Sequence, residues 1–442
     1  MNQHLNRRSF LSFAAIGAAA VTLAACGTTS GSSGNDAAAS GDFKAPAKDL
    51  SATLTYAIWD AAQKPAMQKI IAEFNKQYPN IKINIDVTPS KGAAYWTKIQ
   101  TQASSNTLPD VFWMNGPRIK LYAENNQLMP LTGLVSAKAI DTANYPKALV
   151  DLYTVKGTFY GAPKDFDTSA LFYNKALLKA AGVAEPTGDW TWDDVKKSGA
   201  AVSKFYEGKG IYGYGGDLTG GQTSYYNTII EAGGTVISTD GKKSGYDSPQ
   251  AIAGLQFWRD LISTGVSPTM QQLTDTLTSD MFTSSKLAMT MDGSWTVGPA
   301  FAALGADLGI VTLPKGPDNA NSVIHGLANV IPANAKNPAA SQAFVAFLAN
   351  EESAKIQADT GTVIPAFNGT QQAWVDSVKS VDLNVFLELA KTASPYPASQ
   401  NTAAWNELEN TLLPQAFAGV KPVSEIAKEL ATQMNAALSQ ES

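Results

Sequence analysis

Residues 52–59 read ATLTYAIW, residues 65–78 read PAMQKIIAEFNKQY, and residues 81–87 read IKINIDV. The first and third segments are rich in β-branched and aromatic residues, and the third alternates apolar with polar side chains, which predicts strands. The middle segment repeats apolar residues at helical spacing, which predicts a helix. Strand–helix–strand alternation favours an α/β fold with largely parallel sheets.

The same alternation continues along the chain. A short apolar strand is predicted at 111–113, and helices are predicted at 95–103, 169–181, 192–206, 249–264, 338–348 and 424–438. The residues after 50 are too many for one hydrophobic core, so we expect two lobes. Open α/β sheets place ligands at the carboxyl ends of their strands, and a cleft between two such lobes is the expected site.

Composition excludes several kinds of chemistry. The 442 residues carry a net charge of −5 and include one cysteine, Cys26, and two histidines, His4 and His325. These counts exclude Cys/His zinc clusters, disulfide scaffolds, Cys–His nucleophiles and HExxH proteases. A Ser-His-Asp triad would have to use His325. The acidic balance and the absence of a basic run give no basis for nucleic-acid binding.

Residues 1–25 are typical of a signal peptide. Arg7 and Arg8 precede an uncharged run of Ala and Gly that is too short for a membrane-spanning helix. The run ends in Leu23-Ala24-Ala25-Cys26-Gly27, which resembles a bacterial lipobox and implies cleavage before Cys26 and a diacylglycerol on its thiol. The twin arginines resemble a twin-arginine export signal, and ordinary Sec export remains open. Residues 26–49 are predicted to form a flexible tether.

Ordered segments along the rest of the chain carry a family resemblance. They are FNKQYP (74–79), LPDVFW (108–113), YGAPKDFDT (160–168) followed by LFYNK (171–175), LAMTMDGSW (287–295) and LPKG (313–316). Their order and spacing over about residues 50–440 resemble the extracellular solute-binding proteins of ABC sugar importers, the group that includes maltose-binding protein.

The resemblance implies a periplasmic-binding-protein-like fold, with two α/β lobes, several hinge crossings and an interlobe cleft that closes on a ligand. Lobe one would comprise 50–163 plus 313–361, and lobe two 164–312 plus 362–442. The protein would bind a carbohydrate, with an oligosaccharide preferred, outside the cell and deliver it to ABC permease subunits. It would need no cofactor or metal. Because the chain contains no GxxxxGK[ST] motif, the ATPase would be a separate chain.

The best candidate ligand contacts are acids and tryptophans. Sugars present apolar C–H faces and hydroxyl edges, which suit aromatic plates and carboxylate or amide acceptors. Asp165 and Asp167 are two apart in an extended segment, so both would share a face. By resemblance, Asp167 matches a sugar-binding glutamate of the family, while Trp113 and Trp295 match aromatic residues that face the sugar. The alternative for the Asp pair is to cap the helix expected from Ser169.

Further candidates lie at the ends of predicted strands, before a predicted turn, on the return segment and in the C-terminal helical region. Trp59 could be a plate or a core residue, and Asp60 a ligand acceptor or a helix cap. A lone histidine is more often structural than a ligand, and a core position for Trp405 stays open. Tyr225 is preferred over its neighbour Tyr226 as a third aromatic shelf. The full set of these further candidates is Trp59, Asp60, Asn115, Tyr225, His325 and Trp405.

An enzyme remains the alternative function. A glycoside hydrolase could use Asp165 and Asp167 as its paired carboxylates. Glycosidase acids flank the scissile bond from opposite sides, whereas two acids one pleat apart on a strand more easily hold hydroxyls on one side. The spacing therefore favours binding.

Overall fold

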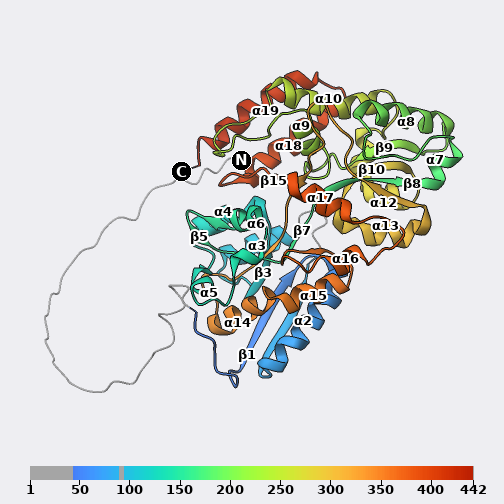
Figure 1. Ribbon diagram of the computed structural model, residues 1–442. Helices are drawn as coiled ribbons and strands as arrows, with labels where there is room; N and C mark the ends of the chain where they lie inside the picture. The colour runs from blue at the N-terminus through green and yellow to red at the C-terminus, as the bar shows by residue number, and fades with distance from the viewer. Residues whose placement is uncertain (1–42, 89–93, 442) are drawn as a thin grey trace, which may run out of the picture.

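The computed structural model describes residues 43–88 and 94–441, and the chain forms two lobes (Figure 1). The predicted signal peptide, Cys26 and most of the predicted tether lie outside the described residues. Of that tether, residues 43–49 are described and contain no helix or strand. None of the helices in the described ranges combines the length and the apolar character needed to cross a membrane.

Lobe one is built on a five-stranded sheet. Its order is β2 (Ile81–Val87), β1 (Ala52–Ile58), β3 (Val111–Met114), β13 (Ala328–Val330) and β6 (Ala162–Pro163). The first three strands are parallel, and β13 is antiparallel to both of its neighbours. Helices α2 (Lys64–Gln77), α14 (Pro338–Leu348) and α15 (Glu351–Asp359) pack together over it, with the Phe74 ring 5.2 Å from that of Phe344. The remaining elements of this lobe include α3 (Ala94–Ser104), α4 (Gly116–Glu124), α5 (Thr132–Ser136), α6 (Lys147–Leu152), β4 (Thr154–Val155), β5 (Thr158–Phe159) and α16 (Gln372–Val375).

Lobe two contains a four-stranded sheet in the order β11 (Leu308–Val311), β8 (Ser169–Asn174), β10 (Leu287–Gly293) and β9 (Tyr212–Gly216). Only β9 and β10 run parallel, so the prediction of largely parallel sheets is wrong for this lobe. Every residue of β8 and β10 is buried. The helices of this lobe include α7 (Lys175–Ala180), α8 (Trp192–Phe205), α9 (Tyr225–Glu231), α10 (Pro249–Ser263), α11 (Met270–Asp275), α12 (Thr278–Thr283), α13 (Val297–Leu304), α17 (Asn384–Thr392), α18 (Thr402–Phe417) and α19 (Val423–Leu438).

One predicted helix is wrong over its first half. Residues 169–174 form the strand β8, and α7 begins only at Lys175, where the Asn174 side chain caps it by accepting from the Leu177 amide at 3.1 Å. A strand flanked by two others and buried on both faces shows a continuous apolar run, which cannot be told from a buried helix by periodicity. The predicted strand at 81–87 and the predicted helix at 338–348 are confirmed residue for residue.

Within the described residues, the chain passes between the lobes at three places. It first crosses between β6 and β8, at residues 164–168. The return lies later than the predicted residue 313, because Lys315 and Asp318 still donate backbone hydrogen bonds to Trp190 and Glu231 of lobe two. The last crossing also lies later than residue 361, because the Asn368 amide donates to the Asn144 carbonyl of lobe one at 2.7 Å.

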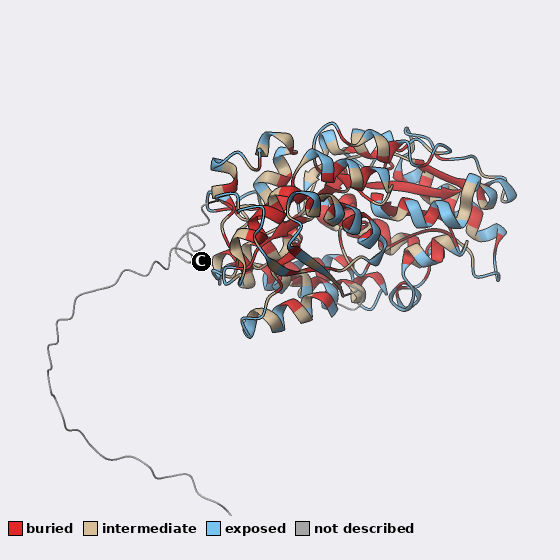
Figure 2. Cartoon of the chain, turned by 90° about the horizontal axis from the view of Figure 1, so that it is seen from below, coloured by how far each residue is buried: buried red, intermediate tan, exposed pale blue. Residues whose placement is uncertain are grey.

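Two short strand pairs tie these crossings together. Strand β7 (Asp165–Phe166) pairs with β14 (Ile364–Pro365), and β12 (Val323–Ile324) pairs with β15 (Ser394–Pro395). Figure 2 shows buried strands running through the interior, while the surrounding helices expose their outer faces. The hinge region is therefore a small set of paired, largely buried segments between two separately packed sheets.

Candidate functional site

The first crossing and the return segment lie side by side. The Asp167 amide donates to the His325 carbonyl at 2.8 Å and the His325 amide donates back at 3.2 Å, while Lys164 donates to Leu327 at 2.8 Å. This pairing brings together three of the predicted site residues, Asp165, Asp167 and His325, at the junction of the lobes.

Asp165 holds the crossing together. One carboxylate oxygen lies 2.5 Å from the Lys164 Nζ, and the other accepts from the Leu327 amide at 2.9 Å. Lys164 also donates to Gln63 at 2.6 Å and lies 4.3 Å from the centre of the Trp113 ring. Burial raises the pKa of Asp165 even though Lys164 opposes the shift. Both of its oxygens are engaged within the protein, so Asp165 serves the hinge rather than a ligand in this conformation.

Asp167 is the more available acid. Its side chain is 15% exposed, one oxygen accepts from Gln222 Nε2 at 2.6 Å, and the other lies 3.8 Å from His325 Nδ1. His325 Nε2 accepts from the Gly116 amide at 3.1 Å, which places the ring proton on Nδ1, the atom that faces Asp167. His325 is buried, and its backbone pairing with Asp167 fixes where that acid lies. No sequence pattern pointed to Gln222, which reaches Asp167 from a loop 55 residues away.

Trp295 is an exposed aromatic surface beside this acid. It lies in the short helix η4 (Ser294–Thr296), directly after β10, and is 38% exposed. A Cβ at Gly293 would come within 2.1 Å of the Trp295 ring, so the ring lies against bare backbone. The Ser294 amide donates to the Thr168 carbonyl at 3.2 Å, which puts Trp295 next to the crossing that carries Asp167.

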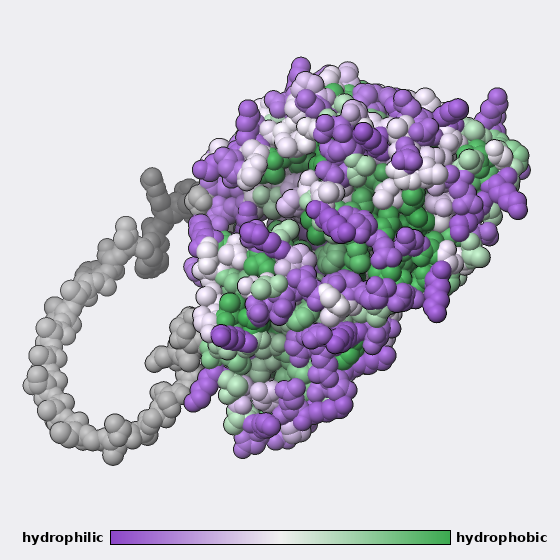
Figure 3. Space-filling model, viewed as in Figure 1, coloured by the Kyte–Doolittle hydropathy of each residue, from purple (hydrophilic) through white to green (hydrophobic). Residues whose placement is uncertain are grey.

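The surroundings of Trp295 combine apolar surface with a buried acid. Figure 3 shows apolar surface over α12 and α13, where Phe301 is also 37% exposed. Asp292, at the carboxyl end of β10, accepts from the Gly293 amide at 2.8 Å, and burial raises its pKa to about 7. The DGSW motif carried a signal for Asp292, but only its tryptophan was selected as a candidate.

Lobe one contributes an aromatic cluster at the ends of β1 and β3. Trp59 is partly exposed, and its ring centre lies 4.9 Å from that of Tyr95, 5.7 Å from that of Trp96 and 5.2 Å from that of Trp113. Arg118 lies over the Trp96 ring at 4.7 Å. Trp59 and Trp96 therefore offer partly exposed faces in this lobe. Trp96 was missed from the sequence because it falls inside a predicted helix.

Trp113 is not such a face. It is fully buried, its Nε1 donates to the Tyr56 hydroxyl at 2.7 Å, and Lys164 lies over its ring. The prediction of a sugar-facing Trp113 is therefore corrected. The residue packs at the hinge, because all four residues of β3, in the middle of the sheet, are buried.

The side chains of Asp60 and Asn115 differ in whether they have hydrogen-bond partners within the protein. Asp60 caps the short helix that follows β1, accepting from the Ala62 amide at 2.8 Å and from Gln63 at 3.0 Å, which is the capping alternative. Asn115 precedes α4 but makes no side-chain cap bond, and its buried Oδ1 has no partner among the described residues. Asn115 therefore stays a candidate ligand contact.

Tyr225 and Trp405 are corrected as ligand contacts. Tyr225 is 1% exposed, and Tyr226 and Trp405 are fully buried. The two tyrosine hydroxyls donate to Glu409 at 3.4 Å and 2.8 Å, and Trp405 Nε1 donates to Ser399 at 2.9 Å. Helices α9 and α18 pack inside lobe two, so these aromatic rings serve its core.

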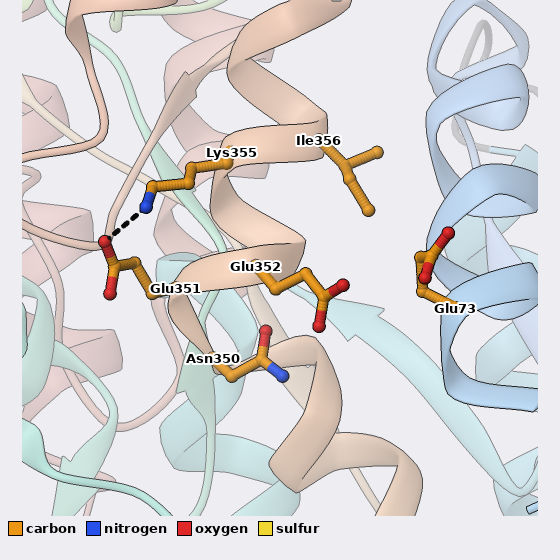
Figure 4. Close-up of a pocket in the computed structure, with 6 residues that line it drawn as sticks. All are labelled: Glu73, Asn350, Glu351, Glu352, Lys355 and Ile356. Atoms are coloured by element: carbon orange, nitrogen blue, oxygen red, sulfur yellow. Dashed lines mark ion pairs between the residues drawn. The ribbon is translucent and has the colours of Figure 1, made fainter. Parts of the chain in front are cut away.

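The outer face of lobe one carries a notch. It lies between α2 and α15, has a volume of about 610 Å³, and is lined by Glu73, Asn350, Glu351, Glu352, Lys355 and Ile356 (Figure 4). Lys355 is already paired with Glu351 at 2.6 Å, and no aromatic ring lines the notch. It lacks the plates that a sugar requires.

The arrangement at the lobe junction suits binding of a neutral polar molecule. Trp59 and Trp96 come from lobe one, Trp295 comes from lobe two, and Asp167 lies on the segment between them. Aromatic faces and a carboxylate acceptor match the two kinds of surface on a sugar ring. Within residues 43–88 and 94–441, no group of three His, Cys, Asp or Glu side chains is placed to hold a metal ion.

Comparisons with known proteins agree with this geometry. The family model of bacterial extracellular solute-binding proteins matches residues 59–355. A Streptococcus pneumoniae (strain ATCC BAA-255 / R6) protein named as a maltooligosaccharide ABC transporter solute-binding lipoprotein is 25% identical over 393 residues, covering 86% of this chain and 88% of its own. A galactooligosaccharide-binding protein of Bacillus subtilis (strain 168) is 27% identical over 363 residues, covering 79% and 78%.

A solved structure shows the same fold. An ABC substrate-binding protein of Listeria monocytogenes in complex with cycloalternan superposes with a TM-score of 0.82 at 23% identity, covering 88% of this chain and 100% of that one. The predicted two-lobed α/β fold is therefore confirmed.

Proposed function

Because the chain belongs to the bacterial extracellular solute-binding proteins, we propose that its two lobes close on a neutral oligosaccharide and present it to an ABC permease. The family membership confirms the resemblance read from the sequence motifs. The proteins of this family bind solutes rather than transform them.

The observation that carries the choice of a sugar is the placement of Trp295 beside Asp167. A partly exposed indole ring can stack on the C–H face of a sugar, and the adjacent carboxylate can accept its hydroxyl protons. Trp59 and Trp96 would supply the opposing face from lobe one. The maltooligosaccharide and galactooligosaccharide binding named for the relatives supports the same ligand class.

The hydrolase alternative requires two available carboxylates, and Asp165 is not available. Asp165 is engaged by Lys164 and Leu327, so Asp167 has no free partner acid on the same strand. A glycosidase needs two carboxyl groups on either side of the bond that is cut.

The proposal also covers location and partners. Cys26 would carry the lipid that holds the protein on the outer face of the cell membrane, after cleavage of residues 1–25. Residues 26–49 would be the tether between lipid and lobes. The closed form would dock on permease subunits driven by a separate ATPase chain.

The test is a calorimetric titration with neutral di- to tetrasaccharides, each matched with a carboxylated sugar of similar size as the control. We expect a neutral oligosaccharide to bind at micromolar concentration or below and to be recovered intact. Recovery of a shortened saccharide from the purified protein would favour the hydrolase, and an absence of heat across the whole neutral panel would contradict the sugar proposal.

Removing the exposed ring should weaken binding. We expect Trp295→Ala to lower affinity for the sugar found in that titration by about 5- to 150-fold, which corresponds to about 1–3 kcal/mol for a lost stacking surface. Phe205→Ala is the matched control, since Phe205 is also an exposed aromatic of lobe two, at the far end of α8. Equal affinities for the two variants would mean that the ligand lies elsewhere.

A further inference from the structure

Helix α4 of lobe one contacts α18 of lobe two. Figure 1 shows α4 on the side of lobe one that faces the C-terminal segment of lobe two. Helix α4 begins directly after the carboxyl end of β3, at the sheet edge where Trp59 follows β1. The α4–α18 contact is therefore on the side where the ligand is proposed to bind.

One side-chain hydrogen bond joins the end of α4 to the residue pair that precedes α18. The carboxylate of Glu124, at the end of α4, is 12% exposed and accepts from Lys156 of its own lobe at 3.3 Å. The same oxygen accepts from Nε2 of Gln400, which lies just before α18. The backbone N–H of Gln400 donates to the Glu441 carboxylate at 2.8 Å. This bond ties the lobe-two side of the contact to the C-terminal segment.

Among the described residues, the same two helices also carry two unpaired charges of opposite sign, Arg118 on α4 and Glu407 on α18. The Arg118 guanidinium lies over Trp96 but has no hydrogen bond or ion pair within the described chain. Burial lowers the pKa of Arg118, and Tyr122, Glu407 of α18 and Tyr396 each oppose that shift. Glu407 is exposed, and its carboxylate likewise forms no ion pair in the described ranges. Arg118 and Glu407 thus lie on the two helices that contact each other across the lobe junction, and neither charge has an ion-pair partner in the described ranges.

We propose that α4 and α18 form an interlobe latch, in which Arg118 and Glu407 attract each other and, with the Glu124–Gln400 bond, favour the closed arrangement even without ligand. The apparent affinity of a protein for its ligand scales with the populated fraction of the binding-competent state. The latch would therefore change the affinity for the ligand of the proposed function without changing which ligand is preferred.

The test measures lobe separation in the ligand-free protein, so its outcome is independent of the sugar proposal. In the full chain, Cys26→Ser removes the only thiol, and Ser136→Cys with Ser263→Cys places one label on each lobe. We expect Glu407→Gln and Arg118→Gln each to lengthen the mean separation of the labels. Added salt should do the same to the parent protein and much less to the variants, because it screens exposed charges.

A charge swap distinguishes attraction from mere packing. Arg118→Glu combined with Glu407→Arg should restore the parent separation, and Glu207→Gln, an equal charge change at an exposed site of lobe two, should leave it unchanged. We also expect Glu407→Gln to weaken ligand binding by about three- to tenfold. Unchanged separations in both single variants, or a swap that fails to restore the parent value, would overturn the latch.

Discussion

Lys164→Met should destabilise the protein by about 3–5 kcal/mol at neutral pH, since it leaves the buried Asp165 carboxylate without its ion-pair partner. The substitution also removes the hydrogen bond to Gln63 and the cation over the Trp113 ring. Burial already raises the pKa of Asp165, so the lone carboxyl would take up a proton as the pH falls. The loss should therefore be smaller at acid pH. Urea unfolding at two pH values measures it.

Two further variants separate charge from volume. Lys164→Met with Asp165→Asn should recover most of the stability, because no unpaired buried charge remains. Lys147→Met breaks an exposed ion pair with Asp151, at 2.5 Å on one helix, and should cost less than about 0.5 kcal/mol. If Lys164→Met is as mild as Lys147→Met, the pair at the crossing does not hold the hinge.

Glu231→Gln should make the protein more stable than the parent at alkaline pH and leave it nearly unchanged at pH 5. Glu231 is fully buried, and burial raises its pKa from 4.5 to about 8, with the Trp192 Nε1 donating to one oxygen at 2.7 Å. The folded state therefore binds this proton more tightly than the unfolded state. The stabilisation is complete below about pH 4.5, falls as the pH rises, and is lost above about pH 8.

The expected difference at pH 9 is up to about 5 kcal/mol, because each unit of the pKa shift from 4.5 to about 8 corresponds to about 1.4 kcal/mol. The other Glu231 oxygen has no partner within the described ranges, so a neutral amide replaces the protonated acid with little rearrangement. Thermal unfolding of both proteins across this pH range is the measurement, with the exposed Glu207→Gln as the control. Parallel pH profiles for parent and Glu231→Gln would contradict a buried, protonated Glu231.

Local patterns predicted the elements that carry a start signal or an alternation of apolar and polar residues. The helix at 338–348 begins with Pro338 at its first turn, and the strand at 81–87 alternates in and out, so both could be read from neighbouring residues. Residues 169–174 could not, because a strand buried on both faces lacks that alternation. The late crossings, after residues 313 and 361, depend on contacts between distant segments that carry no local signature.

The site was predictable only where local geometry constrains it. The DGSW segment pointed to Trp295, and the structure leaves this ring partly exposed against the bare backbone of Gly293. Residue type alone does not indicate which way a side chain faces. Trp113, Trp405 and Tyr225 were therefore predicted as ligand contacts although their side chains are buried in the core. Gln222 on Asp167 and Lys164 over Trp113 arise from the fold, which brings separate segments together.

The most direct measurement of the central claim is small-angle scattering of the protein at the end point of the calorimetric titration. A two-lobed receptor that closes on its ligand should show a smaller radius of gyration with the bound oligosaccharide than without it. The saturated sample should also return that oligosaccharide uncut. An unchanged radius of gyration at confirmed saturation, or a shortened sugar, would contradict the account.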